Sequence, residues 1–323
     1  MVRVLVTGVG AVIGYGIVRS LKALHGDVEI VGMDIYADAV GQHWCDRFEQ
    51  ATPAAGPDYV EYLVRLIDKH AVDLVIPGIE QDAAKMSAEI ARLRSTRAKF
   101  ALNDAELMRV AADKWQMHVR LAASGYEVIP TRTDGAFAEL AQDLGLPFLL
   151  KPRRSYASKG IVRIGTEEEL HFWRDRAGDN FMVQKIIGDD DAEFTIGAFG
   201  LGDGTCSQSI TFQRRLSGEG ATAKATVVRI PELEQLVGRL AHTFRPVGPT
   251  NFQFRQHEGR FLLLEINPRI SSSTSIRTAF GYNEAEMCID YYLRGKSPAP
   301  RPLGSGRAVR YIEDVIFHDC DHL

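Results

Sequence analysis

The sequence has little cysteine: only Cys45, Cys206, Cys288 and Cys320 occur among 323 residues. They form no CxxC or Cys/His cluster, which argues against structural zinc and favours a reducing, cytoplasmic setting. No apolar run approaches the roughly 18 residues of a membrane span, so we expect no membrane partner. The net charge is −4, so nucleic acid is not expected as a partner either.

What remains is an ordinary globular composition, with 45% hydrophobic and 25% charged residues. The N-terminus, MVRVLVTGVG, is predicted to be a strand entering a glycine turn, not a signal peptide. Strand and helix patterns then alternate over residues 1–102, including a helix over 81–94. Such alternation predicts a Rossmann-like α/β domain with a parallel sheet.

The glycine turn at residues 8–16 offers one functional hypothesis. With Asp34 at the end of the next predicted strand, it fits a nicotinamide-dependent reductase. A glycine turn also serves tight packing of strand on helix without any ligand. The Tyr-x-x-x-Lys pair of short-chain reductases is missing, because Tyr156 and Lys159 are only three positions apart.

After residue 102 the pattern becomes mixed. We predict one helix over residues 105–125, with Lys114 near its middle, and a capping box formed by Thr166 and Glu169. Several strands follow, among them a C-terminal one over residues 307–317. The fold class expected is α/β and α+β, with units at residues 1–102, 103–187 and 188–323.

The segment FLLLEINPR, residues 261–269, is a buried strand that ends in polar residues. Alternation would place Phe261, Leu263, Glu265 and Asn267 on one face. A carboxylate and an amide side by side offer hard oxygen ligands of the kind that suit Mg²⁺. The alternative is an edge strand with solvated polar ends.

The preceding segment TNFQFR should pair with this strand as a hairpin. If Gln253 belongs to the same site, it must lie opposite Glu265, and Asn251 opposite Asn267. That register predicts an odd loop, such as residues 258–260, because a one-residue slip reverses every side chain. A two-residue loop is expected to be unfavourable, since Glu258 would need φ > 0.

Six segments resemble the ATP-grasp ligases, in the branch of carbamoyl-phosphate synthase and biotin carboxylase. They are ADKWQMH, PFLLKPRRSYASKGIVRI, FMVQKIIG, DAEFTIGAF, GPTNFQFR and LLLEINPR, within about residues 100–300. The preceding α/β unit resembles the domain that usually stands before this fold (a pre-ATP-grasp domain). The resemblance implies a lid subdomain hinged over a larger body, with the nucleotide between them.

Residue roles follow from the resemblance. It implies ATP contacts for Lys114, Lys151, Ser158, Lys159, Gly160, Gln184, Lys185, Ile186, Ile187 and Glu193. It implies metal ligation by Gln253, Glu265 and Asn267, and catalytic contacts to the transferred phosphoryl group by Arg269, Arg215 and Lys224, with Arg214 as a further candidate. Relatives often carry an acid where Lys185 stands. For the individual basic residues, the alternative is a solvated surface charge.

The function implied is an ATP- and Mg²⁺-dependent carboxylate–amine ligase, with Mn²⁺ as an alternative metal. ATP would phosphorylate a small-molecule carboxylate, and an amine would displace phosphate. The runner-up is carbamoyl-phosphate-type phosphorylation of bicarbonate or carbamate, and less favoured is the reductase. Candidate acceptor contacts are residues 10–15, Glu80 and residues 271–277. Relatives are usually homodimers, which makes a homodimer the expected state.

Overall fold

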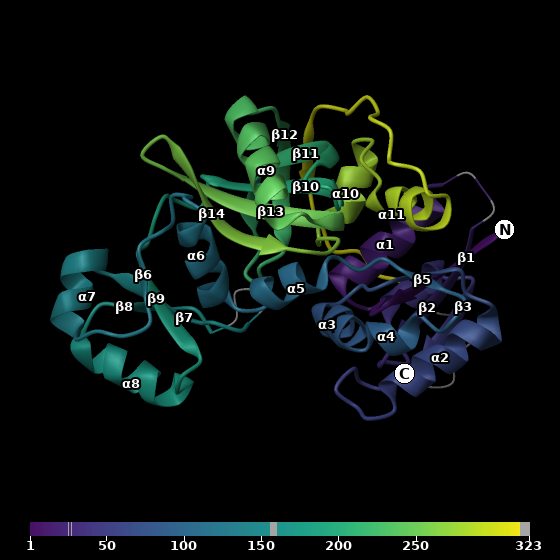
Figure 1. The fold of residues 1–323 in the computed structure, drawn as a ribbon, viewed down its shortest axis with the longest axis horizontal. Coiled ribbons are helices and arrows are strands. Elements are labelled where there is room, and N and C mark those ends of the chain that lie inside the picture. The colour runs from purple at the N-terminus through teal and green to yellow at the C-terminus, as the bar shows by residue number, and fades with distance from the viewer. Residues whose placement is uncertain (25, 27, 156–159, 317–323) are drawn as a thin grey trace.

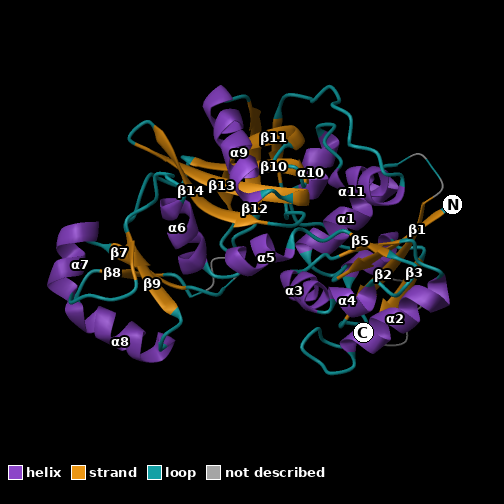
Figure 2. Ribbon diagram, in the orientation of Figure 1, coloured by secondary structure: helices purple, strands orange, loops and turns teal. Residues whose placement is uncertain are grey.

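The computed structural model of the chain describes residues 1–24, 26, 28–155 and 160–316, which are organised by three sheets (Figures 1 and 2). A five-stranded parallel sheet and a four-stranded lid sheet lie at opposite ends of the long axis. A six-stranded antiparallel sheet, the body, lies between and above them. The predicted combination of α/β and α+β units is therefore confirmed.

The N-terminal unit has the strand order β3-β2-β1-β4-β5. Its elements are β1 (Val2–Thr7), α1 (Val12–Lys22), β2 (Val28–Asp34), the 3₁₀ helix η1 (Val40–Trp44), β3 (Arg47–Gln50), α2 (Tyr59–His70), β4 (Leu74–Ile76), α3 (Glu80–Ala88), α4 (Ile90–Leu93) and β5 (Lys99–Phe100). The single helix expected over residues 81–94 is broken at Glu89. The first turns of α1 and α3 both follow strands of the sheet, as parallel α/β topology requires.

Two short helices lead to the lid. They are α5 (Ala105–Ala111) and α6 (Lys114–Ala123), where a single helix was predicted. Asp113 causes the break, because its side chain accepts hydrogen bonds from the N–H groups of Trp115 and Gln116 and so caps a new helix. Lys114 is therefore the first residue of α6, not a residue in the middle of a helix.

The lid sheet has the order β6-β9-β7-β8. Its elements are β6 (Thr131–Arg132), α7 (Phe137–Leu144), β7 (Phe148–Pro152), β8 (Val162–Ile164), α8 (Glu167–Ala177) and β9 (Phe181–Gln184). The predicted capping box is confirmed, since Thr166 and Glu169 exchange hydrogen bonds at the start of α8. Figure 1 shows α7 and α8 on the outer side of this sheet.

The body sheet has the order β14-β13-β10-β11-β12-β15. Its elements are β10 (Glu193–Leu201), β11 (Cys206–Leu216), β12 (Thr222–Val228), α9 (Pro231–Phe244), β13 (Val247–His257), β14 (Arg260–Asn267), α10 (Thr274–Ala279), α11 (Glu284–Cys288), the π-helical η2 (Ile289–Leu293) and β15 (Arg307–Val309). The C-terminal strand is shorter than predicted and ends at Val309.

The two faces of the body sheet are covered differently. One face packs Ile196, Phe252 and Ile266 against α9, whose buried residues include Leu240. The other face packs against the α10–η2 segment and, through it, α1 of the N-terminal unit. Towards the lid, this second face carries mainly polar residues, among them Glu193, Arg214 and Gln253. Within the described residues no helix has the length and apolar character needed to span a bilayer.

Candidate active site

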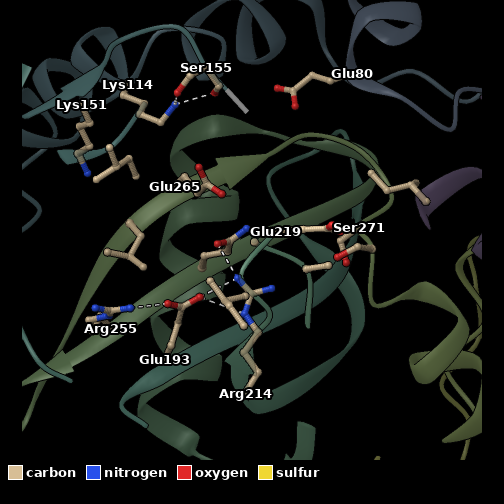
Figure 3. A pocket seen from close by; sticks show the side chains of 18 of the residues that line it. Glu80, Lys114, Lys151, Ser155, Glu193, Arg214, Glu219, Arg255, Glu265 and Ser271 are labelled. Atoms are coloured by element: carbon tan, nitrogen blue, oxygen red, sulfur yellow. Dashed lines mark hydrogen bonds and ion pairs between the residues drawn. The ribbon is translucent and has the colours of Figure 1, made fainter. Parts of the chain in front are cut away.

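A cavity of about 530 Å³ lies where the three sheets meet. It is bounded by the first turns of α1 and α3, by β7, by the segment after β9 and by the polar face of the body sheet (Figure 3). Eleven residues predicted to contact the nucleotide, the metal or the transferred phosphoryl group line it: Lys114, Lys151, Gln184, Lys185, Ile186, Ile187, Glu193, Arg214, Gln253, Glu265 and Arg269. Of the candidate acceptor contacts, residues 11–13, Glu80, Ser271 and Ser272 also line it. Residues from all three sequence units therefore converge on one space.

The glycine turn contributes backbone, not a free carboxylate. Asp34 is nearly buried, and its two oxygens accept hydrogen bonds from the N–H groups of Gly10 and Tyr36 at 2.8 and 3.0 Å. A Cβ on Gly14 would lie 2.0 Å from the carbonyl oxygen of Gly8, so glycine is required for packing there. These contacts give the turn a structural explanation that does not involve a nicotinamide nucleotide.

Lys114 is held at the edge of the cavity by its position as the first residue of α6. Its Nζ donates to the carbonyl oxygen of Ser155 at 2.7 Å and to the hydroxyl oxygen at 3.2 Å. Asp113, next to it, forms an ion pair with Arg153 at 2.7 Å. These contacts join the start of α6 to the chain that leaves β7. The lysine is thereby aimed at the cavity as a point charge.

Lys151 is buried in the cavity wall, with 8% of its surface exposed. Its Nζ donates to Oε1 of Gln184 at 2.5 Å, and Nε2 of Gln184 donates to the hydroxyl of Thr131 at 2.8 Å. Burial lowers the pKa of Lys151 to about 8, although the carboxylate of Glu265 opposes the shift. Gln184 is therefore fixed from both sides and orients the lysine.

The hinge, residues 185–187, follows β9. The N–H of Lys185 donates to the carbonyl oxygen of Pro130 at 3.0 Å. At the other end, Gly188 has φ +56°, and its N–H donates to Nδ1 of His257 at 3.2 Å. A Cβ on Gly188 would lie 2.4 Å from the carbonyl oxygen of Gln256, so only glycine fits. The hinge backbone is thus fixed to both the lid and the β13–β14 hairpin.

The hairpin has the predicted pairs but not the predicted loop. Gln253 lies opposite Glu265 and Asn251 opposite Asn267, as expected. However, His257 pairs with Arg260, so the loop is the even pair Glu258 and Gly259, with φ of +50° and +78°. The prediction of an odd loop was therefore wrong.

A β-bulge reconciles the even loop with the pairs. Phe254 pairs with Leu263 and Gln253 with Glu265, which leaves Leu264 as an extra residue in β14. Because of the bulge, Leu264 and Glu265 both line the cavity. Phe261 and Leu263 instead pack with the α9 side of the sheet. The predicted face shared by Phe261, Leu263 and Glu265 is therefore also wrong.

Gln253 reaches the cavity with its side-chain oxygen already bound. Nη2 of Arg214 donates to Oε1 of Gln253 at 2.7 Å and to Oε1 of Glu193 at 2.8 Å. The other oxygen of Glu193 accepts from Arg255 at 2.6 Å (Figure 3). Arg214 and Glu193 are both at most 5% exposed. In this arrangement Gln253 acts as a partner of Arg214, and a metal there would share its oxygen with that guanidinium.

Glu265 lines the cavity, and Asn267, which is 8% exposed and outside the lining, lies directly beside it. Nδ2 of Asn267 donates to Oε1 of Glu265 at 2.9 Å, and Oδ1 of Asn267 accepts from Arg269 at 3.2 Å. Arg269 also reaches Glu80 in α3, at 3.3 Å. No group of three or more His, Cys, Asp or Glu side chains suited to a metal occurs among the described residues. One carboxylate and one amide oxygen suit Mg²⁺, which takes few protein ligands when substrate phosphates complete its shell.

Arg215 and Lys224 do not belong to the cavity wall. They pair across β11 and β12 and share an exposed face, where Arg215 forms an ion pair with Asp191. Strand alternation instead turns Arg214 inward. Gly160 is exposed and lies outside the lining, whereas Ser158 and Lys159 lie outside the described residues.

Several residues at the site were not predicted from the sequence, among them Arg255 and Glu219 in the lining and Thr131 behind it. Arg255 could have been found, because it lies two positions after Gln253 on the same strand face. Thr131 supports Gln184 from a two-residue strand that has no clear pattern. Glu219 reaches the cavity from the turn between β11 and β12, and a turn gives no periodic signal.

Comparison with known proteins supports the fold. The family described as "ATP-grasp in the biosynthetic pathway with Ter operon" matches residues 179–315. The chain has an ATP-grasp fold. That match includes the hinge, the body sheet and the β13–β14 hairpin, and therefore most of the ATP-grasp cavity.

Solved structures extend the ATP-grasp likeness to most of the chain. N5-carboxyaminoimidazole synthetase from Staphylococcus aureus has a TM-score of 0.72 at 16% identity, covering 94% of this chain and 80% of that one. A biotin carboxylase from Campylobacter jejuni has a TM-score of 0.74 at 16% identity, covering 94% and 74%. At this identity the likeness shows the fold alone.

A curated sequence relative is formate-dependent phosphoribosylglycinamide formyltransferase of Yersinia pestis. It is 26% identical over 181 residues, which are 52% of this chain and 44% of the relative. The chain thus covers less than half of that protein's length.

Proposed function

We propose that the chain is an ATP- and Mg²⁺-dependent ligase that joins a small-molecule carboxylate to an amine through an acyl phosphate. One observation carries the proposal: Lys114, Lys151 and Glu265, on three separate elements, line a single cavity together with the hinge. Two cations and a metal-binding carboxylate at one end of an apolar slot match a nucleoside triphosphate.

The adenine would lie against the hinge. Leu149, Leu264 and Ile187 give this end apolar walls. The N–H of Ile187 has no hydrogen-bond partner among the described residues and could donate to a ring nitrogen. Lys185 adds a side chain without an ion-pair partner in the described chain, where relatives often carry an acid.

The phosphates would lie between the lid and β14. Lys114 and Lys151 neutralise their charge, and Arg214 and Arg255 hold Glu193 away from them in ion pairs. Glu265 and Asn267 would hold Mg²⁺, which when bound would supply positive charge against the charge that develops on the phosphates. Arg269 lies next to these ligands and would hold the transferred group.

The acceptor end would be formed by Glu80, Ser271 and Glu219, which Figure 3 labels, together with Arg269. There a carboxylate oxygen would attack the γ-phosphorus, and the bond to the β-phosphate oxygen would break to release ADP. An amine would then attack the carbonyl carbon of the acyl phosphate, with release of phosphate and a proton. Arg269 and the serine hydroxyl suit the carboxylate, and Glu80 and Glu219 suit a cationic amine.

Calorimetry tests the nucleotide assignment. Mg²⁺-ATP should bind and NADH should not, because the turn carboxylate Asp34 is occupied by backbone N–H groups. Tight NADH binding without Mg²⁺-ATP binding would instead establish the reductase hypothesis. A screen for ADP release with pooled organic acids and amines, followed by mass spectrometry of the products, would identify the substrates. The same screen would distinguish amide formation from carbamoyl-phosphate-type chemistry, because in the latter bicarbonate alone supports ADP release.

A further inference from the structure

A buried ion pair lies behind the candidate metal ligands. Arg277 in α10 and Glu284 in α11 are both 0% exposed, and Nη1 of Arg277 donates to Oε1 of Glu284 at 3.0 Å. Nη2 of Arg277 also donates to Oδ1 of Asn251 at 2.5 Å and lies 3.3 Å from the hydroxyl of Thr195. Arg277 therefore links two helices to the central strands β10 and β13.

The pair continues the polar row of the sheet. Asn251 lies opposite Asn267, next to the pair formed by Gln253 and Glu265. Cross-strand partners carry their side chains on the same face, so Asn251 is the immediate neighbour of Asn267. Arg277 reaches this row because Gly197 leaves space: a Cβ there would lie 2.6 Å from the guanidinium carbon.

Asn251 is held from two directions. Its Oδ1 accepts from Arg277 and also from the hydroxyl of Thr195, at 2.7 Å. Two donors on one oxygen fix the plane of the amide. The position of the strand that faces Asn267 is thereby set by side chains that never reach the cavity.

Stability alone does not explain this arrangement. Removing two charges fully from water costs hydration free energy, which their mutual attraction must offset. A protein with an apolar pair of similar volume in their place is often equally stable or more stable. Here the compensation is incomplete, since Nε of Arg277 and Nδ2 of Asn251 have no hydrogen-bond partner among the described residues. A buried pair of this kind is better explained by a demand on geometry.

We propose that Arg277 is a positioning residue that, with Glu284 as its counter-ion, holds Asn251 and thereby sets the spacing of Asn267 and Glu265 for the metal–nucleotide complex. The proposal rests on the proposed function, because it concerns the metal ligands of that site. Neither Arg277 nor Glu284 lines the cavity, so their effect on the metal is transmitted through Asn251 and the β13–β14 pair.

The test uses the double variant Arg277→Met/Glu284→Leu, which replaces the ion pair by an apolar pair. Calorimetry gives the affinity for ADP with and without Mg²⁺, and thermal unfolding gives the stability. We expect a melting temperature at or above that of the parent protein. We also expect the gain in affinity due to Mg²⁺ to fall about tenfold or more, as when a supporting partner of a metal ligand is lost. Affinity without Mg²⁺ should stay unchanged.

Arg301 and Glu286 provide the control pair. They also join α11 to a neighbouring segment through an ion pair, but Arg301 is half exposed and neither residue lines the cavity. Arg301→Met/Glu286→Leu should keep the full Mg²⁺-dependent gain. A second probe is Thr195→Val, which removes only one of the two hydrogen-bond donors to Asn251. Valine is close to threonine in shape, so this variant should fold, and it should lose part of the Mg²⁺-dependent gain in ADP affinity.

The outcomes are distinguishable. A parent protein without Mg²⁺-dependent ADP binding would overturn the proposed function and this inference together. The inference alone would be overturned by a different result: Mg²⁺ raises the ADP affinity of the parent protein, and it raises the affinity of Thr195→Val and of the folded double variant just as much. Equal loss of affinity with and without Mg²⁺ would also overturn it, since general loosening of the protein predicts that pattern. If the double variant does not fold, Thr195→Val decides alone: a full Mg²⁺-dependent gain in ADP affinity would overturn the inference, and a partial loss of that gain would support it.

Discussion

Gln253 lies directly opposite Glu265 even though their strands are joined by an even, two-residue loop. The bulge at Leu264 makes this relationship possible, because it adds one residue to β14 and none to β13. It also places Leu264 and Glu265, neighbours in sequence, on the same cavity-facing side. A regular strand would separate them. The bulge thus places an apolar side chain next to a carboxylate. In the proposed site, Leu264 would contact the nucleotide and Glu265 would hold the metal.

The metal role proposed for Glu265 can be tested separately from the contribution of Gln253. Glu265→Gln should lower Mg²⁺-dependent turnover by about 100-fold or more, because the charge that holds the ion is lost. Gln253→Ala should cost less, since its oxygen serves Arg214. Steady-state kinetics at varied Mg²⁺ measures both. Equal losses would mean that Gln253 is a direct ligand.

Leu264 should act on the nucleotide and not on the metal. It packs beside Leu262 and Ile187 and lines the cavity next to the hinge. Leu264→Ala should weaken ADP binding by about tenfold, the effect of losing one to two kcal/mol of apolar contact. The loss should be the same with and without Mg²⁺ in calorimetry. A loss confined to Mg²⁺-containing buffer would contradict the division of roles between Leu264 and Glu265.

The hairpin loop predicts a stabilising substitution. Glu258 has φ +50°, a conformation that disfavours a residue with a long side chain, whereas Asn tolerates it. Its contact with Arg260, at 3.4 Å on the surface, contributes little. Glu258→Asn should therefore raise the free energy of unfolding by about 0.5–1 kcal/mol. Denaturant unfolding measures this free energy. The control is Gly259→Ala, which should be destabilising because Gly259 also has a positive φ. A less stable Glu258→Asn would show that the turn is not strained.

The sequence was sufficient for the fold class and for many of the residues that line the cavity. Lys151, the hinge and β14 carry local signals: apolar strands ending in polar residues, at positions that resemble a known fold. These are properties of single segments. The pairs Gln253–Glu265 and Asn251–Asn267 were also predicted, on the premise that Gln253 and Glu265 share a metal site. The pairs are confirmed, although the oxygen of Gln253 accepts from Arg214.

The remaining features depend on contacts between segments. The bulge arises from packing on both faces of β14, which alternation within one strand does not reveal. Glu258 adopts a conformation that propensity disfavours, because the hairpin as a whole compensates for it. Arg214 and Arg215 are adjacent and chemically identical, and only the register of β11 against Glu193 decides which faces the cavity. Asp113 was overlooked as a helix cap because the pattern continues through it.

Lys151 and Lys224 form a matched pair of lysines inside and outside the cavity. Lys151→Met should raise the apparent KM for ATP about 10- to 100-fold, as loss of a charge-assisted contact predicts. Lys224→Met should leave it unchanged, because Lys224 lies on an exposed strand face. Initial rates at varied ATP measure both. An effect of Lys224 and none of Lys151 would place the phosphates on the other side of β12.

The buried lysine should also make nucleotide affinity depend on pH. Burial lowers the pKa of Lys151 to about 8, so the free protein carries this charge below pH 8 and loses it above. Bound phosphates favour the charged form, so the Kd for ADP should rise as pH increases beyond 8, by up to about tenfold per pH unit.

Neighbouring charges provide the internal check on this pH dependence. Glu265 raises the pKa of Lys151, whereas Lys114 and Arg255 lower it. In Glu265→Gln, the affinity for ADP should therefore begin to fall at a lower pH. In Lys151→Met, the affinity should no longer depend on pH around pH 8. Both are measured by calorimetry without Mg²⁺, so that metal binding does not contribute. A pH profile that stays the same in Lys151→Met would assign the titration to another group and remove Lys151 from the phosphate site.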